Sequence, residues 1–103
     1  MLDIYLLTVI MIEDYLGTWI ELGSNWTQKG FLVCTRVDEN NFSMKRREEM
    51  ESVHEILYTV KGTSIACYLR PSIKGTYTKD GSIEWVDVNE PDARATMWIR
   101  RGL

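Results

Sequence analysis

Few side chains in this sequence are of types that could do catalytic chemistry. His54 is the only histidine, and Glu51 and Glu55 lie close enough in sequence to assist it as a general base. Cys34 or Cys67 could act as the nucleophile for such a base. The spacing demands no such pair, and the sequence has no phosphate-cradling glycine loop and no Gly-x-Ser-x-Gly elbow. We therefore interpret His54 as a partly exposed strand residue, and the sequence favours a protein that is not an enzyme.

Neither the cysteines nor the acidic clusters have the pattern of a metal or cofactor site. The two cysteines are too few and too far apart for a cysteine-only metal site, and as small buried apolar residues they indicate a reducing compartment. Glu48, Glu49 and Glu51 follow the basic run 45–47, which predicts a solvated turn whose charges compensate one another. The sequence therefore predicts no metal and no cofactor.

The aromatic side chains are the best indication of a function. They make up 11% of the chain, and core packing explains most of them. Some could instead line a cavity in which a few polar groups orient an apolar ligand. We predict that the ligand-binding residues are Tyr58, Trp85 and Trp98, with Arg94 or Arg100 as the polar anchor.

Short strands must position these residues. Alternating apolar side chains and turn signals such as Lys61-Gly62 and Asp80-Gly81 predict eight strands. Short connections make neighbouring strands antiparallel, and closing the sheet removes its exposed edges. The predicted fold is all-β or β-rich α+β: a meander that closes into a barrel or curved roll, in one domain of residues 16–103. The predicted strands are 18–22, 31–37, 42–46, 53–61, 63–70, 73–79, 82–88 and 94–101.

One segment leaves an alternative open. Residues 44–57 are rich in helix formers, and Met50, Val53 and Leu57 fit a helical stripe. Three basic residues at 45–47 would crowd the positive end of such a helix. We favour a strand, a turn and a second strand. If the helix forms, the fold is an α+β roll with that helix packed on an open sheet.

The first fifteen residues form an apolar segment, predicted as a helix or a strand. Residues 4–12 are apolar except for Thr8, but this run is about half of the roughly 20 residues that span a bilayer. Asp3 and the lack of a small-residue cleavage site do not fit a signal peptide. We therefore predict a cytoplasmic protein without a membrane partner. A second copy of the chain would cover the apolar segment through Ile4, Leu7, Val9 and Ile10, unless translation begins at Met11.

The hexapeptide Asp14-Tyr15-Leu16-Gly17-Thr18-Trp19 resembles the start of lipocalins and fatty-acid-binding proteins. In that superfamily a short helix leads into Gly-x-Trp on the first strand, and an arginine of the last strand lies across the tryptophan. The resemblance implies that Gly17 and Trp19 close the barrel with Arg100 or Arg101, and that the barrel is lipocalin-like. The segment from Gly17 to Ser24 also resembles the avidin opening.

Two functions follow from these observations. The first is a non-enzymatic binder of a small apolar or aromatic ligand. The second is an interaction module that forms a homodimer or a partner complex through the apolar N-terminal segment. The formal net charge of −3 argues against a nucleic-acid partner, because phosphate binding needs a net basic face.

Overall fold

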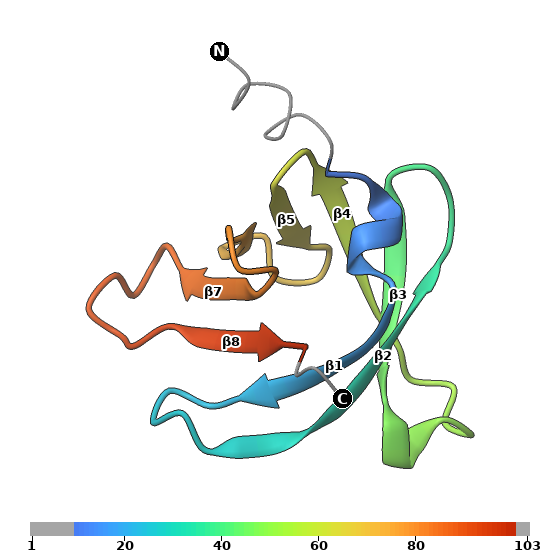
Figure 1. Cartoon of the computed structure of the whole chain (residues 1–103), viewed down its shortest axis with the longest axis horizontal. Helices are drawn as coiled ribbons and strands as arrows, with labels where there is room; N and C mark the ends of the chain where they lie inside the picture. Colours follow the sequence, from blue (N-terminus) through green and yellow to red (C-terminus); the bar gives the residue numbers. More distant parts are fainter. Residues whose placement is uncertain (1–9, 101–103) are drawn as a thin grey trace.

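Eight strands of one antiparallel sheet close into a barrel in the computed structural model, which describes residues 10–100 (Figure 1). Each strand pairs with the next along the chain, and β1 pairs with β8. The predicted meander and its closure into a barrel are therefore confirmed. The strands are β1 (Gly17–Leu22), β2 (Gln28–Arg36), β3 (Asn41–Arg46), β4 (Ile56–Lys61), β5 (Ser64–Cys67), β6 (Ile73–Tyr77), β7 (Ile83–Asp87) and β8 (Thr96–Ile99).

The connections between the strands alternate between two ends of the barrel, because consecutive strands run in opposite directions. The chain enters through the short 3₁₀ helix η1 (Ile12–Tyr15) at what we call the plugged end. Figure 1 shows this helical turn on the right and the β1–β2 and β7–β8 connections on the left. We call the opposite end the open end. It carries the connections 23–27, 47–55, 68–72 and 88–95.

The segment 44–57 forms no long helix, so the α+β alternative is wrong. It contains the end of β3, a single 3₁₀ turn η2 (Arg47–Glu49), a loop and the start of β4. Phe42 and Met44 of β3 are buried in the core, which a strand at period two achieves. The ammonium group of Lys45 donates to the carbonyl of Ser52 at 2.6 Å and shapes the loop that follows. Among the described residues, no helix is both long and apolar enough to cross a membrane.

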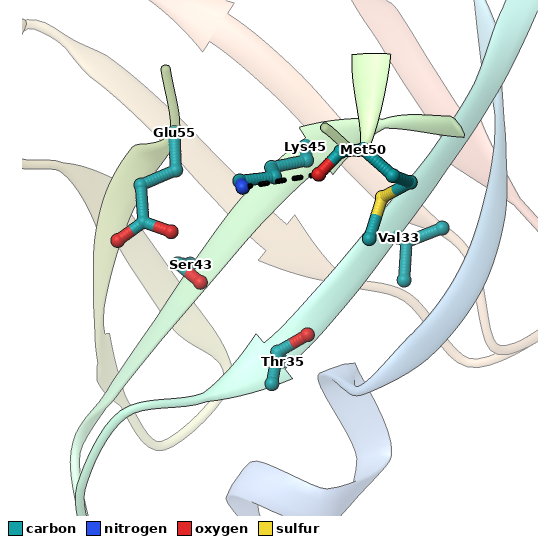
Figure 2. Close-up of a pocket in the computed structure, with 6 residues that line it drawn as sticks. All are labelled: Val33, Thr35, Ser43, Lys45, Met50 and Glu55. Atoms are coloured by element: carbon teal, nitrogen blue, oxygen red, sulfur yellow. Dashed lines mark hydrogen bonds between the residues drawn. The ribbon is translucent and has the colours of Figure 1, made fainter. Parts of the chain in front are cut away.

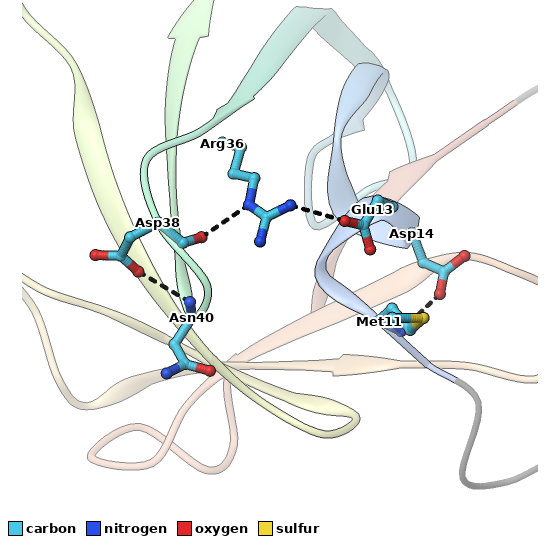
Figure 3. Close-up of polar contacts among 6 residues, drawn as sticks. All are labelled: Met11, Glu13, Asp14, Arg36, Asp38 and Asn40. Atoms are coloured by element: carbon cyan, nitrogen blue, oxygen red, sulfur yellow. Dashed lines mark hydrogen bonds and ion pairs between the residues drawn. The ribbon is translucent and has the colours of Figure 1, made fainter.

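The helix η1 seals the plugged end through Tyr15. This side chain is fully buried, stacks on Phe42 with ring centroids 5.9 Å apart, and donates its hydroxyl to the carbonyl of Gly62 at 2.7 Å. Outside the barrel, Arg36 of β2 forms an ion pair with Glu13 at 2.9 Å (Figure 3). The helix η1 is therefore held by core contacts of Tyr15 and by the ion pair of Glu13 on the outer wall of the barrel.

Trp19 and Arg100 join the first strand to the last. The guanidinium carbon of Arg100 lies 3.9 Å from the Trp19 ring centroid, and Arg100 donates a hydrogen bond to the carbonyl of Leu16. The Trp19 indole is fully buried and donates to the carbonyl of Tyr15 at 2.8 Å. The structure thus brings together the two groups that the resemblance places at the barrel closure. Arg101, the other candidate, lies outside the described residues.

The predicted N-terminal interface falls mostly outside the described residues. Ile4, Leu7 and Val9 belong to residues 1–9, of which the structure describes none. Ile10 is half-buried and packs against the core of its own barrel. The homodimer therefore stays a prediction, and Ile10 already has partners within the chain.

We expect the variant Arg100→Met to lower the free energy of unfolding by about 1–2 kcal/mol, because it removes the cation–π contact and the hydrogen bond to Leu16. Urea denaturation followed by circular dichroism measures this loss. Arg94→Met is the matched control, because Arg94 is exposed on the β7–β8 connection. An equal loss in both variants would contradict the closing role of Arg100.

Candidate functional site

Three of the predicted ligand-binding residues meet inside the barrel. The ring centroids of Tyr58 and Trp85 are 5.1 Å apart, those of Tyr58 and Trp98 5.4 Å, and those of Trp85 and Trp98 4.8 Å. Each of these side chains is at most 6% exposed. We call these three residues the aromatic cluster. Its rings touch one another, so they fill the centre of the barrel.

The sequence makes room for the cluster at Gly75. This residue pairs with Trp85 across the β6–β7 ladder. A Cβ at Gly75 would lie 2.9 Å from Cζ3 of Trp85, which is closer than two carbon atoms can approach. The absence of a side chain at this position therefore lets the large indole lie flat against the opposite strand.

An ion pair borders the interior on the open side of the cluster. Glu21 follows Trp19 at period two on β1, so its side chain points inward, and Arg46 does the same after Met44 on β3. Arg46 Nη2 lies 2.7 Å from Glu21 Oε1, an oxygen that is buried and makes an ion contact without an aligned hydrogen bond. The two side chains are 36% and 21% exposed, so they are in contact with solvent as well as with the interior.

Arg46 is therefore the arginine on this side of the cluster, whereas the two arginines predicted as a polar anchor lie elsewhere. Arg94 is exposed on the β7–β8 connection, and Arg100 lies on Trp19 at the plugged end. Among the described residues, the ion pair of Arg46 is with Glu21 of β1 and not with the glutamates of its own turn. The sequence signal for the position of Glu21 is its spacing of two residues from Trp19, which places both side chains on the inner face of β1.

The indole N–H of Trp85 is buried and has no hydrogen-bond partner among the described residues. Trp85 itself is 5% exposed. An unmet buried donor costs about 1–3 kcal/mol, so buried indoles usually find an acceptor. The interior thus contains an indole N–H whose hydrogen bond the fold does not supply.

The residues that could do reaction chemistry are not brought together. His54 is exposed on the β3–β4 connection, whereas Cys34 and Cys67 are buried and unpaired. Burial raises the pKa of the Cys34 thiol to about 12, which keeps it protonated and unreactive at neutral pH. No three metal-ligating side chains converge within residues 10–100.

A hollow of about 160 Å³ lies on the outer wall where β2 and β3 meet the β3–β4 loop (Figure 2). Lys45 lines it, but its ammonium group is already bound to the carbonyls of Ser52 and Met50, at 2.6 and 3.4 Å. Ligand pockets usually have about 300–1,000 Å³. We interpret this hollow as the seam under a folded loop.

Comparison of the chain with protein-family models, with curated proteins and with solved structures found no match. The features of the chain that bear on its function are the aromatic cluster, the Glu21–Arg46 ion pair and the unpaired indole N–H of Trp85.

We expect Gly75→Ala to lower the free energy of unfolding by about 2–3 kcal/mol, because the new methyl group forces the Trp85 ring out of its place. Tryptophan fluorescence should shift in the folded state. Gly23→Ala is the control: its Cβ would meet the flexible Lys29 side chain at 3.1 Å. A Gly75→Ala protein as stable as the control would show that the indole does not rest on this strand.

Two buried tyrosine hydroxyls and one buried thiol predict that the protein loses stability at alkaline pH. Burial raises the pKa of Tyr15, Tyr58 and Cys34 above their ordinary values of 10.0 for tyrosine and 9.0 for cysteine. The unfolded chain therefore binds fewer protons above pH 9.0, and the free energy of unfolding falls as the pH rises further.

Urea unfolding at a series of pH values up to about 11 tests this expectation. Tyr58→Phe should make the decline shallower, because one shifted group is removed. Tyr68→Phe removes a tyrosine that is 69% exposed and should leave the slope unchanged. Equal slopes in all three proteins would contradict the role of Tyr58.

Proposed function

We propose that the chain is a non-enzymatic binding protein that holds a small aromatic or apolar molecule against the aromatic cluster, on its open-end side. The flat faces of Trp85 and Trp98 suit an aromatic ligand, which stacks on such rings in tilted or edge geometries. The Glu21–Arg46 ion pair lies beside this surface and offers a carboxylate and a guanidinium to the ligand's polar atoms. One apolar surface with a few polar groups is typical of small-molecule sites.

The observation that carries the proposal is the unpaired indole N–H of Trp85. A ligand carbonyl or ring nitrogen would accept this hydrogen bond and remove the cost of leaving it unmet. The ligand class we propose is therefore an aromatic molecule with at least one hydrogen-bond acceptor.

The packing of the interior limits the size of that ligand. An eight-stranded barrel is just wide enough to be filled by side chains or to hold one small molecule. Because the three rings of the cluster touch, a ligand lies on them from the open side or displaces one of them. A lipocalin-like relationship is part of this proposal, supported by the stacking of Arg100 on Trp19. A cytoplasmic location is also proposed, because two unpaired cysteines fit a reducing compartment.

A matched pair of ligands tests the proposal by calorimetric titration. Methyl naphthyl ketone and ethylnaphthalene have nearly the same shape, but only the ketone accepts a hydrogen bond. We expect the ketone to bind about 3- to 10-fold more tightly to the native chain, since one neutral hydrogen bond is worth about 0.5–1.5 kcal/mol.

In Trp85→Phe this preference should vanish, because the N–H is gone. The control Trp26→Phe removes an indole that is half-exposed on the β1–β2 connection and should keep the preference. The preference is the ratio of the two dissociation constants in one protein. Because the two ligands have nearly the same shape, a change in the space left by the substitution affects both and cancels in this ratio. Failure of both naphthalenes to bind the native chain would refute the binding function at this site.

A further inference from the structure

Two buried polar atoms of the interior lack a hydrogen bond, and they are of opposite kinds. Within residues 10–100, the Oε1 atom of Glu21 is an acceptor without a donor, and the indole Nε1 of Trp85 is a donor without an acceptor. Arg46 Nη2 lies 2.7 Å from Glu21 Oε1, but this ion contact is not an aligned hydrogen bond. A buried carboxylate oxygen without a hydrogen bond costs more than a neutral group in the same state. The interior therefore has an unused acceptor as well as an unused donor.

Glu21 lies next to the aromatic cluster on the sheet. It pairs with Trp98 across the β1–β8 ladder, and directly opposite residues point to the same face with Cβ atoms about 4.5–5.5 Å apart. The ring centroid of Trp98 in turn lies 4.8 Å from that of Trp85. Burial above all, and the Glu21 carboxylate among the nearby charges, raises the pKa of the Tyr58 hydroxyl. Glu21 and Trp85 are thus linked through one side chain, that of Trp98, and a two-ring molecule is long enough to contact both.

Arg46 controls access to the unused oxygen of Glu21. It reaches Glu21 from β3 across β2, beside Gly30, which pairs with Glu21 and whose Cβ would lie 3.7 Å from Arg46 Nη1. The absence of a side chain at Gly30 leaves this path open. The Arg46 side chain is 36% exposed, and an ion pair in contact with solvent stabilises a fold only weakly. Arg46 can therefore turn outwards and leave Oε1 to a donor on a ligand.

The two opposite charges beside the cluster favour an uncharged ligand. A ligand carboxylate has no N–H to offer Glu21 and is repelled by its charge, and a ligand ammonium group is repelled by Arg46. A neutral amide carries what the two unpaired atoms lack, because its N–H donates a hydrogen bond and its carbonyl accepts one. The aromatic cluster supplies the apolar surface for the rest of such a molecule.

We propose that the ligand is an uncharged aromatic amide, either a carboxamide or a lactam, whose carbonyl accepts from the Trp85 indole and whose N–H donates to Glu21 Oε1. This inference rests on the binding function proposed above and narrows its ligand class to molecules that carry a donor as well as an acceptor. Glu21 is then a specificity residue: an analogue without the N–H leaves its buried oxygen unpaired and is rejected.

Three naphthalene ligands of nearly the same shape test the proposal by calorimetric titration of the full chain. Naphthalene carboxamide has an amino group where methyl naphthyl ketone has a methyl group, and naphthoate has a charged oxygen there. We expect the carboxamide to bind about tenfold more tightly than the ketone, because a hydrogen bond to a charged acceptor outweighs the apolar contact that it replaces. Naphthoate should bind most weakly. Tighter binding of naphthoate than of the carboxamide would overturn the proposal, since Arg46 would then anchor an anion.

Variants then test the role of Glu21. Glu21→Met removes the acceptor and nearly keeps the length of the side chain, so the advantage of the carboxamide over the ketone should disappear. Glu84→Met is the matched control: Glu84 precedes Trp85 in sequence but is exposed on the outer face of β7, so the advantage should persist. If Glu21→Met does not fold because Arg46 has lost its partner, the double variant Glu21→Met/Arg46→Met removes both charges and gives the same readout. A carboxamide advantage that survives in either folded variant contradicts the proposal.

The two proposals fail in different ways. If the ketone binds with the preference that depends on Trp85, and the carboxamide binds no more tightly than the ketone, the binding function stands and the role of Glu21 is wrong. If none of the naphthalene ligands binds to the native chain, both proposals are wrong.

Discussion

The pairing of β1 with β8 is the point at which a strip of eight strands becomes a closed surface, and the contact of Arg100 with Trp19 lies beside it. Without this pairing, β1 and β8 would be two edges with unpaired N–H and C=O groups, and edges of that kind invite pairing with other chains. Trp19 also donates a hydrogen bond to the carbonyl of Tyr15, so this one side chain contacts both Arg100 beside the β1–β8 pairing and the helix η1. Removal of either partner should therefore loosen two features of the structure together.

The two ends of the barrel differ in how fully their buried polar groups are hydrogen-bonded. At the plugged end the buried polar groups have partners: Tyr15 donates to Gly62 and Trp19 to Tyr15. Towards the open end, the Trp85 indole lacks an acceptor and Glu21 keeps an incompletely aligned ion contact. Hydrogen-bonded and unpaired buried polar groups are thus separated along the barrel axis, which is the arrangement that the proposed binding function requires.

The period-two pattern predicts the strands well because each one buries alternate side chains against a single core. It also brings Tyr58, Trp85 and Trp98 to the same interior. Glu21 and Arg46 obey the same pattern, but a charged residue is ordinarily assigned to solvent, and their pairing needs the barrel to curve β1 towards β3. Strand ends were harder to predict: the run 63–70 reads as one strand, yet β5 ends at Cys67. Leu69 therefore falls in a loop and is exposed, which no local pattern indicates.

Three kinds of departure from ordinary folding rules occur in this barrel. A bulky residue in a left-handed conformation, apolar side chains in solvent and an unmet buried donor each lower stability, and Trp26, Leu69 and Trp85 supply one example each. Single substitutions such as glycine at Trp26 or serine at Leu69 would remove two of these costs without touching the core, and the third, at Trp85, is the one that the proposed ligand would remove.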